Sequence, residues 1–443
     1  MTPSCARAGG WCRSSPGWTT GNPSSTTSAN PACSTPKKLR SGLRRKVCVP
    51  PNSTGSGRPA SQRKSPPPAC RPPSAASPCG CCRRNSPATC PTDAIETNLE
   101  PLKYFCATPM KVLFSYPLPF FLAHGGSQTL IEALMRELAN LGVKVEPVRW
   151  WDENQTGDII HYVSRPNSNS VRLAHEKNFK VVMTDLLDQT ASRSRPRLFL
   201  QRMAIRTGRT VARGLAGNLS WGVYQEIDAM VYAVGHEWEV AKYLFDASPQ
   251  RGHIIPHGLE DEAIKQLSLP AAEADYLVSV ATIHPRKNTL LLAQAARLAK
   301  VPIVFLGKPY SPDNDYFLHF KELADGQYVR YPGFVSEAEK YRYLRGARGF
   351  ALLSQFESGC ISVYEAAAAG LPLFLSNLPW AAKSYPHAKN LQLAELRTAG
   401  SIASDLGRFY KQAHRRRETT FPVLAWRAVA KEYLRLYEKV LAH

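Results

Sequence analysis

Residues 349–372 limit most strongly what this chain can fold into. The apolar run 349–353 predicts a buried strand, a short polar loop follows, and a helix begins almost at once. The sequence Gly370-Leu371-Pro372 predicts the end of that helix, because a glycine just past the last turn and a proline close behind it are typical of helix exits. Strand, loop and helix together are one unit of an α/β fold.

Two glutamates lie eight positions apart in this stretch, Glu357 in the loop and Glu365 in the early turns of the helix. The start of a helix favours anions, because its first backbone N–H groups have no partners within the helix and the helix dipole is positive there. A carboxylate beside such a site suits sugar hydroxyls better than phosphate. A diphosphate together with sugar hydroxyls describes a sugar nucleotide, which is the ligand that this stretch predicts.

The same pattern begins at Met110. Residues 111–115 predict a strand, the pair Gly125-Gly126 follows in a loop, and leucines at three- and four-residue steps predict a helix that stops at Gly142. A strand at 143–145 completes a βαβ unit, which implies a parallel sheet. Further apolar runs at 158–163, 179–183 and 228–233 extend it to one doubly wound domain, residues 110–270. The glycine pair suits either close backbone approach to a ligand or a simple turn.

The pattern restarts after a short acidic connection expected at residues 260–275. Strands are predicted at 276–280, 302–306 and 372–376, and Ser336 with Glu339 predicts a capping box that opens a helix. We therefore predict a second doubly wound domain, residues 271–423, and a ligand cleft between the two domains at the carboxyl ends of their strands. A last helix, residues 424–443, is expected to pack across both domains.

Residues 1–109 have a different composition. They hold ten of the eleven cysteines and 15 lysines and arginines against three acidic residues, with many serines and prolines and no lasting apolar period. This composition predicts a disordered segment. A disulfide scaffold and a zinc module are weaker alternatives, and a start of translation at Met110 is the interpretation that we favour for the abrupt change.

Beyond this segment, cysteine is almost absent, which favours a reducing, cytoplasmic setting, and no run of about 18 apolar residues predicts a membrane-spanning helix.

Residues 191–213 hold seven arginines and no acidic residue, with apolar side chains interspersed. A basic amphipathic segment indicates contact with an anionic membrane surface, so the protein could lie peripherally at the inner face of a membrane. A solvated basic helix face explains the charge equally well. Nucleic acid is a weaker partner, because no recognised nucleic-acid module accompanies the arginines.

Residues 110–443 resemble glycosyltransferases of the GT-B fold, and most of all the retaining enzymes of glycosyltransferase family 4. The resemblance rests on an ordered set of motifs: Gly125-Gly126, Ile255-Pro256-His257-Gly258, Arg286-Lys287, Glu357 with Glu365, Ala369-Gly370-Leu371-Pro372, and a terminal helix with Trp426 and Tyr437. It implies two Rossmann-like domains facing a cleft, the first on the acceptor side and the second binding the nucleotide sugar. It leaves residues 1–109 unaccounted for.

The resemblance also implies roles for single residues. Glu357, Lys287 and His161 would be catalytic, and Glu365 would hold the ribose hydroxyls. The donor would be bound by Gly125, Gly126, Arg286, Lys287, Gly359, Cys360, Ile361 and Glu365. His161 matches the first histidine of a family His-x-His motif whose second position is Val163 here. A structural, hydrogen-bonded core histidine is the competing interpretation of His161.

The sequence departs from the family at two further places. Ala281-Thr282 stand where the family has Gly-Arg, and Arg286 is the expected replacement for that arginine. Ser358-Gly359-Cys360 stand where the family commonly has Gly-Phe-Gly.

The expected activity is transfer of a sugar, of the hexosyl type, from a nucleoside-diphosphate donor to a glycan or lipid-linked acceptor of the cell envelope, with retention of configuration. No metal and no cofactor are expected, because cations and helix N–H groups can stabilise the leaving pyrophosphate. The lone Asp313-Asn314-Asp315 reads as a surface turn. The alternative is a non-catalytic protein that binds a polyanion or a membrane surface. A dinucleotide oxidoreductase is disfavoured, because neither first βα turn carries Gly-x-Gly-x-x-Gly.

Overall fold

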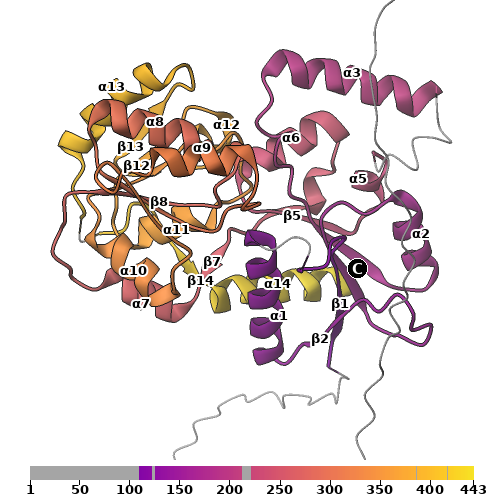
Figure 1. Ribbon diagram of the computed structural model, residues 1–443. Coiled ribbons are helices and arrows are strands. Elements are labelled where there is room, and N and C mark those ends of the chain that lie inside the picture. Colours follow the sequence, from indigo (N-terminus) through magenta and orange to yellow (C-terminus); the bar gives the residue numbers. More distant parts are fainter. Residues whose placement is uncertain (1–108, 122–124, 212–220, 386, 417) are drawn as a thin grey trace, which may run out of the picture. The chain divides into compact units, whose positions relative to one another are not determined.

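The computed structural model describes residues 109–121, 125–211, 221–385, 387–416 and 418–443. The expectations for residues 1–108 and for Arg213 lie outside these ranges. Two six-stranded sheets in the described ranges carry the fold, and both belong to one compact unit of the chain (Figure 1). Every strand pair in them is parallel.

The first sheet has the order β2-β1-β3-β4-β5-β6. Its strands are β1 (Lys111–Ser115), β2 (Lys144–Pro147), β3 (Ile159–Val163), β4 (Lys180–Thr184), β5 (Ala229–Tyr232) and β6 (Gly252–Ile254). The helices of this domain are α1 (Gly126–Asn140), α2 (Ser168–Glu176), α3 (Arg195–Val211), α5 (Val223–Glu226) and α6 (Gly235–Phe245). All four residues of β5 are buried, as expected for a parallel strand that is covered on both faces.

The second sheet repeats the topology as β10-β9-β8-β11-β12-β13. Its strands are β8 (Leu277–Val280), β9 (Ile303–Leu306), β10 (Val329–Gly333), β11 (Gly349–Leu352), β12 (Leu373–Ser376) and β13 (Leu391–Ala394). Its helices are α8 (Thr289–Ala299), α9 (Asp315–Leu323), α10 (Glu337–Gly346), α11 (Ile361–Ala368), α12 (Pro379–Ala382) and α13 (Ala399–Gln412). The predicted fold class of two doubly wound domains is confirmed.

Both sheets reverse their winding direction beside their first strand. The chain adds β2 on one side of β1 and then returns to place β3 on the other side, and β8 lies in the same way between β9 and β11. Ligands of open α/β sheets bind outside the carboxyl ends of the strands at such a reversal. The loops that follow β1, β8 and β11 therefore occupy the positions from which a ligand site is built.

The predicted ends of two helices are confirmed. Gly370 follows α11 with φ +71°, and a Cβ at this position would lie 2.1 Å from the carbonyl oxygen of Arg416, so only glycine fits. Ser336 opens α10 with the capping box: its hydroxyl accepts from the backbone N–H of Glu339, and the Glu339 carboxylate accepts from the backbone N–H of Ser336.

The expected connection at residues 260–275 is wrong in part, because α7 (Asp261–Ser268) lies within it. Asp261 and Glu262 occupy the first turn, where the helix dipole favours acidic side chains. Ala263 and Leu267 are buried in the core of the second domain. Their four-residue spacing was the helical signal within an otherwise polar run.

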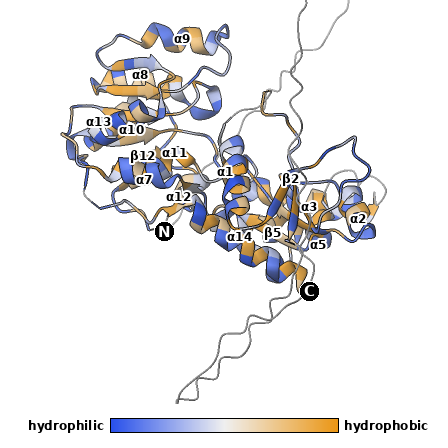
Figure 2. Cartoon of the chain, turned by 90° about the horizontal axis from the view of Figure 1, so that it is seen from below, coloured by the Kyte–Doolittle hydropathy of each residue, from blue (hydrophilic) through white to orange (hydrophobic). Residues whose placement is uncertain are grey.

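The terminal helix α14 (Trp426–Leu441) packs on the first domain, although it follows the second in sequence. Trp426, Val429, Tyr433 and Leu436 are buried in one cluster with residues of β1 and α1. Hydrophobic and hydrophilic residues alternate along the helix (Figure 2), as a helix with one buried face requires. It begins two residues later than expected, because β14 (Leu424–Ala425) pairs in parallel with β7 (Gly258–Leu259).

Candidate functional site

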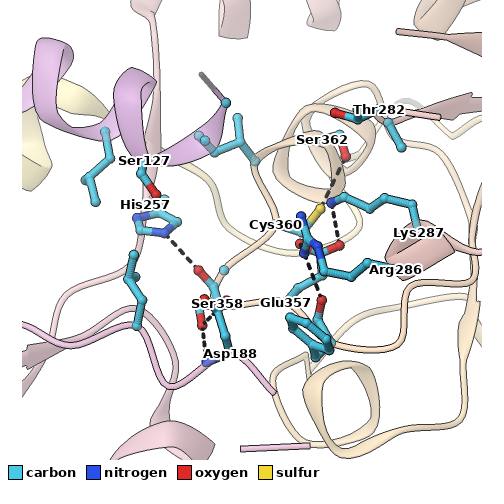
Figure 3. A pocket seen from close by; sticks show the side chains of 18 of the residues that line it. Ser127, Asp188, His257, Thr282, Arg286, Lys287, Glu357, Ser358, Cys360 and Ser362 are labelled. Atoms are coloured by element: carbon cyan, nitrogen blue, oxygen red, sulfur yellow. Dashed lines mark hydrogen bonds and ion pairs between the residues drawn. The ribbon is translucent and has the colours of Figure 1, made fainter. Parts of the chain in front are cut away.

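A cleft of about 440 Å³ lies between loops of the two domains. Its lining combines the loop after β1 and the start of α1 with the loops after β8 and β11 (Figure 3). The lining residues are Tyr116, Gly125, Gly126, Ser127, Leu130, Leu186, Asp188, His257, Ala281, Thr282, Arg286, Lys287, Phe356, Glu357, Ser358, Gly359, Cys360, Ile361 and Ser362. Eight of the ten residues predicted for catalysis or donor binding are in this set, and His161 and Glu365 are not.

Two cations and one carboxylate meet at the centre of the cleft. Arg286 and Lys287 lie in the 3-10 turn Pro285–Lys287 between β8 and α8. Nη1 of Arg286 lies 3.2 Å from Oε2 of Glu357, and Nζ of Lys287 pairs with Oε1 of the same carboxylate (Figure 3). Because the backbone N–H of Gln355 also donates to the Arg286 carbonyl at 2.8 Å, the loops after β8 and β11 are held together.

This arrangement keeps Glu357 ionised. Its side chain is buried, and burial alone favours the neutral acid, but the charges of Lys287 and Arg286 outweigh burial and lower the pKa of Glu357. The cluster carries two positive charges against one negative charge. It therefore has an excess cation available to an anionic ligand in the cleft.

Two helix N-termini point into the same cleft. Neither α1 nor α11 has a side chain capping its first turn, and the first residues of both helices line the cleft. A Cβ on Gly126 would lie 3.9 Å from Cδ1 of Ile361, so the two helix starts are neighbours. Their free N–H groups and positive dipole ends favour an anion between them.

Ser358 links the loop after β11 to the first domain. Its hydroxyl hydrogen-bonds the Glu237 carboxyl on α6 and accepts from the backbone N–H of Asp188 at 2.9 Å. Its carbonyl accepts from Nε2 of His257 at 3.0 Å. A carbonyl can only accept, so Nε2 carries the proton, and burial lowers the pKa of His257 to about 4. The neighbouring Gly359 has φ +74°, and a Cβ there would lie 2.7 Å from the His257 ring, so the position requires glycine.

Burial raises the pKa of two carboxyl groups beside Ser358, those of Glu237 and Asp188. Burial raises the pKa of Glu237 to about 8, and the nearby Asp185 and Asp188 carboxylates act in the same direction. Burial also raises the pKa of Asp188, which lines the cleft. The protonated form of Glu237 is therefore favoured near pH 7 where the two domains touch.

Glu365 lies beneath the cleft and not on its surface. The side chain is buried, and its Oε1 lies 2.7 Å from Nζ of Lys340 on α10. Burial would lower the pKa of Lys340, but the carboxylates of Glu365 and Glu337 raise it, so the lysine is charged. The ribose role of Glu365 stays a prediction.

His161 lies in the core of the first domain, away from the lining of the cleft. Its ring is fully buried and makes hydrogen bonds to the Tyr437 hydroxyl at 2.7 Å and the Thr184 hydroxyl at 2.8 Å. Burial lowers the pKa of His161 to about 3, so the ring is neutral near pH 7. These contacts favour the competing interpretation of a hydrogen-bonded structural histidine, and the catalytic role of His161 stays a prediction.

Asp188, Glu237 and Ser127 were not among the predicted site residues. One available signal was Asp185-Leu186-Leu187-Asp188 directly after the apolar run of β4, because side chains at the carboxyl ends of parallel strands gather at one edge. Glu237 gave no such signal, because it lies in the first turn of a helix, where acidic residues are common.

Asp313 and Asp315 are exposed, and Asp315 begins α9 after the cap Asn314. Within the described ranges, no cluster of three or more histidine, cysteine or acidic side chains could hold a metal ion. Across the same part of the chain, no helix is both long and apolar enough to span a membrane.

Residues 260–419 match the model of the family "Glycosyl transferases group 1". Among solved structures, the chain is similar to sucrose-phosphate synthase from Thermosynechococcus elongatus, with 17% identity, a TM-score of 0.53, and coverage of 75% of this chain and 99% of that one. It is also similar to a glycosyltransferase from Rickettsia africae, with 12% identity, a TM-score of 0.51, and coverage of 76% and 99%. The sequence has no match among the curated proteins. The resemblance to GT-B glycosyltransferases predicted from the motifs is thereby confirmed.

Proposed function

We propose that this chain, which has the GT-B fold and carries a glycosyl transferases group 1 segment in its second domain, transfers a hexosyl group from a nucleoside-diphosphate sugar to an acceptor. One observation carries the proposal. Arg286, Lys287, Glu357 and the uncapped start of α11 meet in one cleft opposite Gly125 and Gly126. Cations and helix N–H groups suit a diphosphate, and a buried ionised carboxylate suits sugar hydroxyls.

The chemistry follows from the charge that develops at the leaving group. When the bond between the sugar C1 and the diphosphate breaks, negative charge grows on the phosphate oxygen and the sugar becomes oxocarbenium-like. Lys287 and Arg286 would stabilise the departing diphosphate, and Glu357 would hold the donor sugar. Both cations are now paired with Glu357, so donor binding would divide their hydrogen bonds between carboxylate and diphosphate.

We propose further that the reaction retains configuration and uses no metal or other cofactor. The acceptor oxygen would form its bond to C1 on the face from which the diphosphate leaves. The departing phosphate oxygen would take the acceptor proton, so the balance needs no further base. This route gives no proton transfer to His161, which is buried and is not among the residues that line the cleft.

The acceptor side of the proposal includes an anionic membrane surface at the segment from Arg193 to Arg213. Of these arginines, Arg202, Arg206 and Arg209 share the single carboxylate of Asp246 at 3.1 to 3.4 Å. Arg193 and Arg197 instead line a second hollow, which shares Phe356 with the cleft. A glycan or lipid-linked acceptor with anionic groups could bind there and reach the donor.

A donor screen tests the proposal. The full chain is heated with UDP, GDP and ADP sugars, and at least one should raise the melting temperature and release its nucleoside diphosphate over time. Glu365→Ala should lose the nucleotide-dependent stabilisation, whereas Glu322→Ala, an exposed glutamate on α9, should keep it. Stabilisation by no donor, with no hydrolysis, would reject the enzyme and favour the non-catalytic binding protein.

A further inference from the structure

An apolar cavity of about 320 Å³, separate from the hollow at Arg193 and Arg197, lies next to the cleft in the first domain. Twelve of its thirteen lining residues are apolar or aromatic, and Ser115 is the exception. It is formed by the loops that follow β1 and β2, together with the side of α1 that carries Ile131 and Met135. Tyr116 lines both this cavity and the cleft, so the two spaces adjoin.

Exposed apolar side chains surround this cavity. Trp150 lines it with 84% of its surface exposed, Trp151 beside it is 85% exposed, and Leu118 and Phe121 extend from the facing loop, with Phe121 83% exposed. Large apolar residues gathered at the mouth of a cavity mark a binding surface in a soluble chain. Indole rings are also the side chains that suit the boundary between water and hydrocarbon.

The loop that carries the tryptophans is held in place by polar contacts. Arg149 pairs with Asp152 at 2.6 Å and with Glu146 at 2.7 Å. The Gln155 side chain, which follows the turn, accepts from the backbone N–H of Arg149 and donates to the Pro147 carbonyl, both of which precede it. Arg149 and Lys111 lower the pKa of Glu146 to about 2. The exposure of the indoles is therefore fixed by the loop and does not result from a loose chain end.

We propose that this cavity binds the hydrocarbon chain of a lipid-linked acceptor, so that the acceptor hydroxyl is presented to the donor cleft past Tyr116. That the ligand is an acceptor rests on the proposed function. That it carries a hydrocarbon chain rests on the apolar lining of the cavity. A purely polar glycan acceptor would gain nothing from these walls. A hydrocarbon chain would be stabilised there, because apolar surface of the chain and of the walls would be removed from water.

The test uses the full chain and a soluble probe. Binding of n-octyl β-D-glucoside, kept below its micelle concentration, is compared with that of methyl β-D-glucoside by calorimetry. We expect the octyl glucoside alone to bind, and Met135→Trp, which fills the cavity, to weaken it about tenfold. Trp150→Ala should weaken it about threefold, while Trp151→Ala, equally exposed but outside the lining, should match the wild type.

Nucleotide-sugar binding is measured on the same samples. It should be equal in all four proteins, which shows that the variants are folded and tests the proposed function separately. Octyl glucoside binding no better than methyl glucoside, or binding by Met135→Trp and Trp150→Ala as tight as wild type, would overturn the inference even if the donor binds normally. If the wild type binds octyl glucoside but no nucleotide sugar, the proposed function is rejected and the cavity's preference for a hydrocarbon chain stands.

Discussion

At the scale of single residues, the decisive group is Glu357. A buried carboxylate is costly unless cations compensate it, and two cations do so here. Arg286 contacts both the Glu357 side chain and the Phe356 carbonyl, at 3.2 and 3.1 Å. The expectation that Arg286 replaces the arginine which the resemblance places at Thr282 stays a prediction. The cleft keeps its positive charge despite that departure.

Glu237 gives a prediction about pH. Its pKa in the folded chain is about 8 against an ordinary value of 4.5, so folding takes up a proton between these values. The contribution of Glu237 to the free energy of unfolding is therefore fully present below about pH 4.5 and is progressively lost as the pH rises to about 8. Measured from pH 5 to 9, the unfolding free energy of the wild type should fall relative to Glu237→Gln, by roughly a few kcal/mol in all.

The control for this prediction is Glu239→Gln, two positions further along α6. Glu239 is exposed and paired with Lys242, so its difference from wild type should be nearly constant over the same range. A flat difference for Glu237→Gln as well would contradict the buried, proton-binding contact with Ser358.

Most of the site at this scale could be predicted from sequence, because its residues follow strands or open helices in patterns that local chemistry explains. Arg286, Lys287, Glu357 and Gly126 all line the cleft. Asp188 and Glu237 could not be found in this way, because their importance depends on Ser358 approaching from the other domain. Contacts between residues more than a hundred positions apart leave no local period.

At the scale of elements, α14 shows how a terminal helix holds the first domain together. The Tyr437 hydroxyl reaches Nδ1 of His161 on β3, and the Tyr433 hydroxyl lies 3.1 Å from that of Thr184 on β4. The sequence predicted this terminal helix, but not its polar contacts with the strands. Helix α7 was not predicted, because only Ala263 and Leu267 show its apolar face and the residues around them are mostly polar.

Tyr437→Phe tests this buried contact. The change should leave Nδ1 of His161 without its partner and lower the unfolding free energy by about 1–3 kcal/mol. Urea denaturation measures the loss, with the exposed Tyr310→Phe as a control that should change little. Donor-induced stabilisation should be unaltered, because His161 is assigned a structural role. Unchanged stability with a lost donor response would contradict that assignment.

At the scale of the whole molecule, the described chain is two copies of one topology whose winding reversals face a single cleft. This arrangement could be predicted from the repeated strand and helix pattern, since parallel sheets place their functional loops at one edge. The contacts through Ser358 and the packing of α14 on the first domain could not, because they join segments far apart in sequence. The proposed donor binding would draw on both domains, because both line the cleft.

Binding of a nucleoside diphosphate through the excess cation of the cleft is the property on which the proposed function depends most. Calorimetry with UDP, GDP and ADP on the full wild-type chain, Lys287→Met and Lys321→Met tests it, because both changes remove one lysine from the second domain but only Lys287 lines the cleft. The account predicts that at least one nucleotide binds the wild type and Lys321→Met equally and Lys287→Met about tenfold more weakly. Binding of no nucleotide, or equal binding by Lys287→Met, would contradict it.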